Sequence, residues 1–314
     1  MYHMDIQQVA TAKTLRALLL FAALGGGMAA EARAQELEPR SYSASPVGVN
    51  FVGASYAYSS GAVVFDPSLP LTDVTAYVNG VVVGWGRTFG ILGRQALATA
   101  SLPYAFGDVS GAVIEQRGSV TRSGLADFKA RLALNLYGNP ARTPQEFARR
   151  ERSPFLVGTS LTATAPTGQY YGDKLINLGT NRWAFKPEVG VSVPWRRLDL
   201  DAYAGVWLFS DNPDFYPGGQ SRHQDPLSAF QGHVSYTFRP SLWIAADATW
   251  YGGGAASVGG GPKSGRQDNT RFGLTLSLPV TASQSAKLAY SRGALVRAGS
   301  NFDTIIAGWQ LHWF

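Results

Sequence analysis

A repeated alternation of apolar and polar residues is the feature that most constrains the fold of this chain. In 271–278 the even positions hold Phe, Leu, Leu and Leu, and the odd positions hold Arg, Gly, Thr and Ser. Successive side chains of a β-strand point to opposite faces, so this period of two predicts a strand with one apolar and one polar face. After residue 34 no stretch contains 18 consecutive apolar residues, which excludes an ordinary transmembrane helix there.

The same alternation recurs in segments close to the ~9–11 residues that cross a bilayer at a tilt. With 271–278 and 127–137, the predicted strands are 49–58, 74–86, 94–103, 155–165, 183–194, 198–209, 227–238, 241–251, 285–293 and 302–313. The sequence therefore predicts an all-β protein, a transmembrane antiparallel up-and-down β-barrel of about twelve strands.

The connections support this prediction because long and short ones alternate, as in outer-membrane barrels with long outer loops and short periplasmic turns. The short ones are 87–93, 194–197, 239–240 and 281–284, whereas 294–301 is short for an outer loop. The long, polar ones are 59–73, 104–123, 166–182, 210–226 and 252–268. One inner connection, 138–154, is long, and its Thr143-Pro144-Gln145-Glu146 is a capping box that predicts a short periplasmic helix near 144–152.

A soluble β-sandwich also has alternating strands and is the main structural alternative. Exchanging the two faces of 127–137 would put Lys129 and Arg131 into lipid at ~2–4 kcal/mol each near the bilayer midplane, whereas the apolar faces carry almost no lysine. Aromatic residues also lie at strand ends, where the interfacial girdles of a membrane barrel are expected. They are Trp85, Tyr104, Trp183, Trp195, Phe238, Trp250, Trp309 and Trp313.

The first 34 residues are typical of a cleaved signal peptide. Lys13 and Arg16 precede the apolar core 17–24, and Ala32-Arg33-Ala34 puts small side chains before a cut at Gln35. A membrane anchor is the alternative, but eight apolar residues fall far short of the ~20 that a spanning helix needs. We therefore expect a signal peptide over 1–34, a barrel over 35–314 and export to the outer membrane.

The last strand carries a pattern that resembles the outer-membrane assembly signal, with Gly308, Leu311 and Trp313 in the spacing Gly-x-x-hydrophobic-x-aromatic and Phe314 as one extra residue. The expected partners are outer-membrane lipid, the barrel-assembly machinery and a small solute. The net charge of +6 comes without a basic run, so no nucleic acid is expected. Because cysteine is absent, disulfides and thiolate metal sites are excluded.

Several phrases resemble a bacterial outer-membrane transporter family labelled "putative MetA-pathway of phenol degradation", over roughly 45–314. These phrases are Leu102-Pro103-Tyr104, Ser123-Gly124-Leu125-Ala126-Asp127, Ala165-Pro166-Thr167-Gly168-Gln169-Tyr170, Gly179-Thr180-Asn181-Arg182-Trp183-Ala184-Phe185-Lys186-Pro187 and Phe209-Ser210-Asp211-Asn212-Pro213-Asp214-Phe215. The family pattern usually has Gly where Ala126 stands. The resemblance implies an uptake channel for aromatic compounds and assigns no catalytic residue.

The polar faces supply the candidate lining of the lumen. Charged side chains of both signs are Asp127, Lys129, Arg131, Lys186, Glu188, Asp199, Asp201, Asp247, Arg271 and Lys287. They either pair and fill the lumen or provide a field that orients polar solutes. Five inward aromatic residues could line a path for an aromatic solute, because such rings stack and still offer polar edges. They are Tyr137, Tyr203, Trp207, Trp243 and Tyr251.

Few residues suggest other chemistry. His233 and Ser235 face inward together, but no Asp or Asn follows closely to orient the imidazole, so a hydrogen bond in the lumen wall is the favoured interpretation. The glycine-rich 252–264 lacks the Gly before Lys of a phosphate loop, because Pro262 takes that place. In 211–214 and Asp225, turn-forming side chains are favoured over a calcium site. No catalytic residue, metal or cofactor is predicted.

The sequence therefore predicts a porin-like outer-membrane channel for passive diffusion or uptake of small, aromatic or hydrophobic molecules. One alternative is a plugged structural or adhesive barrel that binds a partner through its outer loops, and a remoter one is a barrel hydrolase. The solute, the direction of transport, the openness of the lumen and the oligomeric state stay undetermined at this stage.

Overall fold

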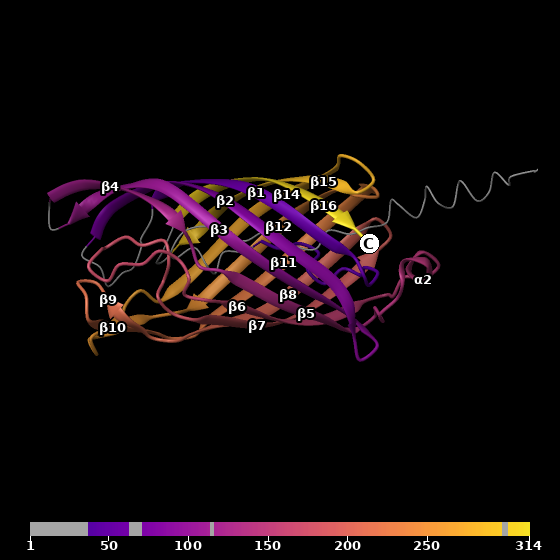
Figure 1. The fold of residues 1–314 in the computed structure, drawn as a ribbon, viewed down its shortest axis with the longest axis horizontal. Helices are drawn as coiled ribbons and strands as arrows, with labels where there is room; N and C mark the ends of the chain where they lie inside the picture. Colours follow the sequence, from indigo (N-terminus) through magenta and orange to yellow (C-terminus); the bar gives the residue numbers. More distant parts are fainter. Residues whose placement is uncertain (1–36, 63–70, 114–115, 297–300) are drawn as a thin grey trace, which may run out of the picture.

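The computed structural model describes residues 37–62, 71–113, 116–296 and 301–314. The expected signal peptide, 1–34, lies outside the described residues and stays a prediction. The described strands are tilted relative to the long axis and form a sheet that closes into a barrel (Figure 1).

Twelve long strands form the wall, as the sequence predicts. They are β1 (Asn50–Ala62), β2 (Leu71–Ile91), β3 (Arg94–Val113), β5 (Lys129–Tyr137), β6 (Leu156–Thr164), β7 (Ala184–Trp195), β8 (Leu198–Phe209), β11 (Leu227–Arg239), β12 (Leu242–Gly253), β14 (Gln267–Pro279), β15 (Gln284–Val296) and β16 (Asn301–Trp313). Each pairs antiparallel with the wall strands on both sides in chain order, and β16 pairs with β1 to close the circle.

The barrel has a turn end and a loop end. At the turn end four hairpins are joined by short connections, 92–93, 196–197, 240–241 and 280–283. The turn end corresponds to the periplasmic side of an outer-membrane barrel and the loop end to the outer side.

Several predicted loops at the loop end are wrong in extent, because strands continue into them. β3 runs on to Val113 and pairs there with β4 (Gln116–Leu125), so 104–123 is largely a hairpin. The predicted loop 59–73 loses residues to β1 and β2 in the same way. Beyond the membrane both strand faces meet water, so the ladder continues without the apolar–polar alternation on which the sequence prediction depends.

Two other predicted loops contain short strands. β9 (Asn212–Phe215), β10 (Gln220–Gln224) and β13 (Ala256–Val258) form a separate three-stranded sheet in the order β13–β10–β9. The segments 210–226 and 252–268 therefore build a small sheet at the loop end of the barrel (Figure 1).

The predicted periplasmic helix is present as α2 (Pro144–Ala148), with the expected capping box. The backbone N–H of Thr143 donates to Glu146 Oε2 at 2.8 Å, and Phe147 is buried beneath the helix. The helix ends four residues earlier than predicted, because the chain must return to the wall before β6 begins. Arg150 follows it, and burial together with Arg152 and Arg142 lowers the pKa of its guanidinium to about 10.

The distribution of side chains is inverted relative to a soluble protein. Large apolar side chains are exposed on the outer surface of the wall, while the interior holds buried charged and polar groups. All eight predicted girdle aromatics are exposed, from Trp250 at 38% to Trp195 at 59%. Such a surface is stable only against hydrocarbon, and the interior is the place to look for a functional site. Within the described ranges, no α-helix is long and apolar enough to cross a bilayer.

Candidate functional site: the barrel lumen

Most of the side chains that the sequence predicts to line the lumen are buried or half-buried in the structure. Those that are buried are Asp127, Arg131, Lys186, Glu188, Asp201, Tyr203, Trp207, His233, Trp243, Asp247, Tyr251 and Arg271, and those that are half-buried are Lys129, Asp199 and Lys287.

The structure places Tyr137 differently from the sequence prediction. A β-bulge between Asn135 and Tyr137 in the pairing with β6 interrupts the alternation, so Leu136 and Tyr137 are both exposed. The Tyr137 ring stacks on Phe155, with 4.7 Å between ring centroids, at the turn end. A bulge adds one unpaired residue, which a strict period of two does not anticipate.

Glu188 on β7 is the centre of one buried polar cluster. Its carboxylate lies 3.2 Å from Lys186 Nζ and 3.7 Å from Arg131 Nη2 on β5. The side-chain amide of Gln231, on β11, also donates to it at 3.3 Å. Because two cations and an amide surround one carboxylate, a charge of this kind is tolerated inside the barrel.

His233 on β11 is the centre of a second cluster. The strand register sets it opposite Asp247 on β12, and His233 Nδ1 lies 2.7 Å from Asp247 Oδ1. The second carboxylate oxygen of Asp247 accepts a hydrogen bond from Thr275 Oγ1 on β14 at 2.9 Å. No Asp or Asn follows His233 closely in the sequence, but the strand register brings Asp247 opposite it across the hairpin, where its carboxylate contacts the imidazole.

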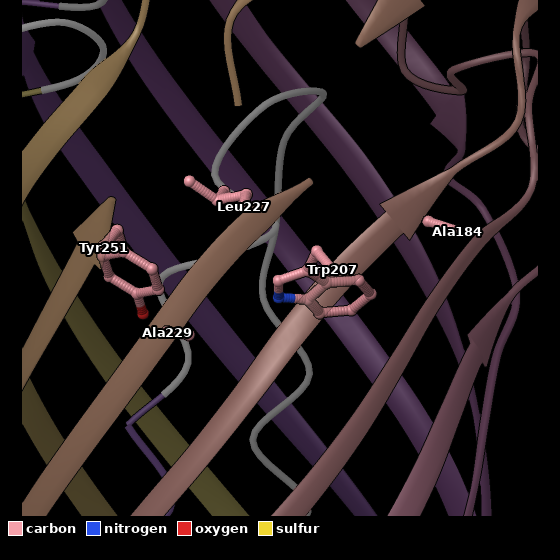
Figure 2. Close-up of a cluster of buried hydrophobic side chains, with 5 residues drawn as sticks. All are labelled: Ala184, Trp207, Leu227, Ala229 and Tyr251. Carbon is pink, nitrogen blue, oxygen red and sulfur yellow. The ribbon is translucent and has the colours of Figure 1, made fainter. Parts of the chain in front are cut away.

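The lumen aromatics separate into two groups. Trp207 and Tyr251 lie toward the loop end, packed with Ala184, Leu227 and Ala229 of neighbouring strands (Figure 2). Trp243 lies near the turn end, packed with Ala245. Tyr203 lies between these groups, its ring centroid 5.2 Å from that of His233.

A segment that the sequence gives no reason to place inside the barrel, residues 37–49, lies in the lumen; we call it the lumen segment. Arg40 Nη2 donates to Asp199 Oδ2 and to Thr237 Oγ1, each at 2.6 Å. Its guanidinium carbon also lies 4.7 Å from the ring centroid of Trp243. The next residue donates its backbone N–H to the hydroxyl of Tyr203 at 3.0 Å. The segment therefore contacts β8, β11 and β12 at once.

Tyr42, also in the lumen segment, occupies a slot on β6 and β7, which adjoin β8 in the wall. Gly158 on β6 and Gly190 on β7 are direct cross-strand partners, and a Cβ added to either would lie 2.1 Å or 2.4 Å from the Tyr42 ring. The Tyr42 hydroxyl donates to Glu188 Oε1 at 3.0 Å and is 3.0 Å from Ser160 Oγ. The two glycines thus provide the space that this ring fills.

The other end of the lumen segment is held at the turn end before the chain enters β1. The backbone N–H of Val47 donates to the carbonyl of Arg142 at 2.9 Å, and that of Gly48 donates to the carbonyl of Thr88 at 2.8 Å. Residues 37–49 alternate neither with period two nor with a helical period, so the sequence carries no signal that separates them from a linker.

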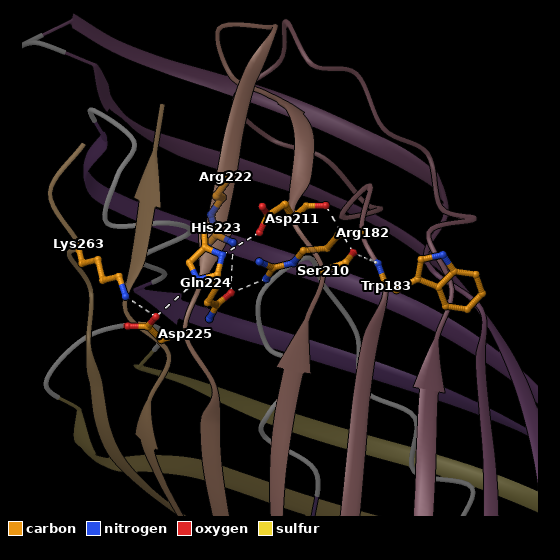
Figure 3. A network of polar contacts seen from close by, with 9 residues as sticks. All are labelled: Arg182, Trp183, Ser210, Asp211, Arg222, His223, Gln224, Asp225 and Lys263. Carbon is orange, nitrogen blue, oxygen red and sulfur yellow. Dashed lines mark hydrogen bonds and ion pairs between the residues drawn. The ribbon is translucent and has the colours of Figure 1, made fainter. Parts of the chain in front are cut away.

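The β9–β10–β13 sheet and its polar contacts lie at the loop end of the barrel. Arg182 and Arg222 are buried there and both donate to the side-chain oxygen of Gln224 (Figure 3). Asp127, predicted to face the lumen, is buried and accepts hydrogen bonds from the backbone N–H groups of Gly168 and Thr180. It therefore fixes the connection between β6 and β7.

A cluster of exposed ion pairs lies beside the same small sheet. His223 Nδ1 lies 2.8 Å from Asp211 Oδ1, and Lys263 Nζ lies 2.6 Å from Asp225 Oδ1 (Figure 3). The hydrogen bond from Lys263 holds the pKa of the Asp225 carboxyl below its ordinary value. Among the described residues, no group of three or more His, Asp or Glu side chains is arranged to hold a metal ion.

The proposed assembly pattern lies on β16, whose whole length pairs with β1. Trp313 and Phe314 are exposed, and Leu311 and Gly308 are partly buried. The aromatic end is therefore accessible on the outer surface, while its recognition by assembly machinery stays a prediction.

Comparison with solved structures shows the fold. The crystal structure of the COG4313 outer membrane channel from Pseudomonas putida F1 has a TM-score of 0.74 at 22% identity, covering 88% of this chain and all of that one. The transport unit of the autotransporter AIDA-I from Escherichia coli has a TM-score of 0.50 at 10% identity, with 99% of both chains covered. With the exposed apolar surface, this fold places the chain in a bacterial outer membrane.

At the level of sequence, a family model described as "Putative MetA-pathway of phenol degradation" matches residues 53–311. This range contains almost the entire wall. No curated protein gives a significant match.

Proposed function

The chain belongs to the family described as "Putative MetA-pathway of phenol degradation", and we propose that it is an outer-membrane channel for the passive diffusion of small hydrophobic or aromatic molecules. The observation that carries this proposal is the inverted barrel, with an apolar exterior and an interior of buried polar and aromatic side chains. The driving force is the solute gradient, and the lumen supplies selectivity without a cofactor.

The chemistry of the interior supports a solute that combines an aromatic ring with a polar group. Trp207 and Tyr251 lie near the loop end and Trp243 near the turn end, with the polar clusters around Glu188 and His233 between them. Cations already pack on two of these rings, Lys186 on Trp207 and Arg40 on Trp243. The interior is mostly polar with a few aromatic side chains, so it offers both hydrogen bonds and ring contacts to such a solute. The solved relative from Pseudomonas putida is named as an outer membrane channel, which agrees with this function.

The lumen segment is part of the proposed mechanism. It lies across the path in the turn-end half of the lumen, so a solute passes only after this segment moves. Cleavage at the predicted site would leave two residues before Leu37. The segment would then be covalently connected to the wall only where it joins β1, and its other contacts with the wall are non-covalent. A short segment with one free end is displaceable at lower cost than a loop held at both ends.

Two measurements test the channel. Purified mature protein is incorporated into planar bilayers, and the ion current is recorded for wild type and for variants that loosen the lumen segment. In parallel, intact cells with and without the protein are supplied with a dilute ring-labelled aromatic solute. We expect stepwise currents and faster uptake when the protein is present; a barrel that passes no current in any variant and leaves uptake unchanged would contradict a channel.

A second candidate function is a plugged barrel that binds a partner through its outer surface, and the lumen segment favours it. The β9–β10–β13 sheet and the Arg182–Gln224 contacts give such a barrel an ordered loop end. The same current recordings separate the two candidates, because a structural barrel stays closed even when the lumen segment is released.

A hydrolase remains the remoter alternative, and we propose that the protein has no such activity. His233 has an orienting carboxylate, but in the part of the chain that the structure describes Ser235 Oγ has no hydrogen-bond partner and so is not paired with the imidazole. A nucleophile needs that contact with its base. An esterase activity that disappears in Ser235→Ala would contradict this assignment.

Export also belongs to the proposal. We infer that residues 1–34 are removed during export and that the barrel-assembly machinery inserts the chain through its last strand. Mass spectrometry of the mature protein should give an N-terminus at Gln35, and deletion of Trp313 and Phe314 should lower the amount of folded barrel in the membrane.

A further inference from the structure

The contact with Asp247 uses one ring nitrogen of His233, and the other, Nε2, has no hydrogen-bond partner among the described residues. An ionised carboxylate only accepts hydrogen bonds, so the contact with Asp247 favours the form of His233 that carries a proton on Nδ1. In the neutral ring Nε2 then presents a lone pair. Within the described residues Nε2 has no hydrogen-bond partner, although the His233 side chain is completely buried.

Three neighbouring side chains share this condition. Gln231 Oε1, Ser235 Oγ and Thr249 Oγ1 are buried and, across the described ranges, have no hydrogen-bond partner. Gln231 and Ser235 lie on the same face of β11 as His233, and the register sets Gln231 opposite Thr249 on β12. Native proteins pair the great majority of their buried polar atoms, with protein, water or a ligand. Other buried polar atoms of the described residues also have no protein partner, but these four lie together on one face of two adjacent strands, where one ligand can reach them.

The chemistry of the four atoms defines that ligand. His233 Nε2 and Gln231 Oε1 accept hydrogen bonds, while the two hydroxyls accept or donate. A ligand that satisfies this set must therefore carry an O–H or N–H donor. The Tyr203 ring lies beside His233 and supplies an aromatic surface next to the four atoms.

The lumen segment lies beside these atoms. Ser41 is hydrogen-bonded to the Tyr203 hydroxyl, and the Tyr42 ring packs edge-on against Tyr203 with 5.2 Å between centroids. Arg40 is bonded to Thr237, one inward position beyond Ser235 on β11. Movement of this segment would open the wall at the four unpaired atoms.

We propose that Gln231, His233, Ser235 and Thr249 form a recognition site for a neutral aromatic solute with a hydroxyl donor, and that His233 Nε2 accepts the hydrogen bond from that hydroxyl. This proposal rests on the channel function and deepens it. Phenol carries the required hydroxyl donor, whereas toluene, which has nearly the same shape, lacks it and leaves the four polar atoms unpaired.

The test measures the ¹⁵N signals of the His233 ring by NMR. The mature protein, labelled with ¹⁵N-histidine, is placed in lipid nanodiscs and titrated with phenol or with toluene, as wild type and as Tyr42→Ala. His223 and His312 serve as internal controls. We expect an unprotonated Nε2 signal from His233 that shifts on addition of phenol, with toluene binding at least about tenfold more weakly.

Two conservative variants locate the site. Ser235→Ala and Thr249→Val together remove two unpaired oxygens without breaking any hydrogen bond described for them, so the barrel should remain folded. The double variant should bind phenol about threefold to tenfold more weakly, the change expected for a lost hydrogen bond. Thr162→Val is the matched control, because Thr162 Oγ1 on β6 is equally buried and likewise has no partner among the described residues.

Three results would overturn the proposal: a protonated Nε2 in the free protein, equal responses to phenol and toluene, or no response in either background. An equal loss in Thr162→Val would also overturn it, because the effect would then not belong to β11 and β12. If uptake by cells requires the protein but phenol and toluene bind alike, the recognition site fails while the channel stands. If phenol binds at His233 but uptake does not depend on the protein, the channel fails instead.

Discussion

Substitution of Gly158 by alanine tests whether the lumen segment is a displaceable plug. A Cβ at Gly158 would lie 2.1 Å from the Tyr42 ring, and its three nearest atoms all belong to Tyr42. The variant therefore acts on one side chain of the lumen segment and leaves the wall's own contacts intact. The Tyr42 ring must leave its slot and give up its contacts with Glu188 and Ser160.

The size of the effect follows from the packing. Overpacking of a tight contact costs typically 1–3 kcal/mol. If this cost falls only on the state with Tyr42 in its slot, the ratio of displaced to seated lumen segment rises about 5-fold to 150-fold. In planar bilayers we expect a larger fraction of time in the conducting state, with a similar current per open barrel, because the wall is unchanged.

Gly232→Ala is the matched control, since a Cβ at Gly232 meets no atom within 4 Å. Tyr42→Ala should raise the open fraction by itself, and Gly158→Ala in that background should add nothing, because the clash has lost its partner. A folded Gly158→Ala barrel with the same open fraction as wild type would refute the reasoning, and so would an equal effect of Gly158→Ala with and without Tyr42.

Other predictions address the lumen, the outer surface and the ion pairs at the loop end. Trp207→Ala and Trp243→Ala should slow the uptake of an aromatic solute while the folded barrel still migrates differently from the boiled protein on gels; unchanged uptake would remove these rings from the path. Leu274→Arg on the lipid-facing surface should cost ~2–4 kcal/mol in urea titrations of the inserted barrel, whereas Leu92→Arg in an exposed turn should cost almost nothing. Asp225, whose pKa Lys263 lowers, keeps its ion pair at neutral pH and loses it as the pH falls through that lowered pKa. In Lys263→Met the NMR titration of Asp225 should move to higher pH, and an unchanged titration would contradict the contact.

The wall could be predicted because a bilayer imposes a strict rule on each strand. Segments such as 271–278 alternate cleanly, since one face meets hydrocarbon and the other meets the lumen. Where this rule stops, prediction fails: β3 and β4 continue past the membrane, where both faces are wet. At Tyr137 a single bulge reverses which face a residue occupies, and no residue type announces it.

The inside of the barrel was only partly predictable. Period two identifies which residues point inward, and this suffices for Glu188, His233 and Trp207. It does not say which inward residues meet, because that depends on the register between strands. Asp247 illustrates the point, since it lies fourteen positions after His233 yet directly opposite it. The lumen segment has no periodicity, so its place is seen only in its contacts, such as those of Arg40 with Asp199 and of Tyr42 with the glycine pair.

The pairing of β1 with β16 has a consequence for the folding of the barrel. These strands come from opposite ends of the described chain, yet they share thirteen consecutive paired positions. Until the final strand arrives, β1 and β15 both expose backbone edges that are prone to pair with other molecules. The seam therefore makes completion an all-or-none event: a polypeptide halted before Asn301 is not a slightly smaller pore but an open, adhesive sheet.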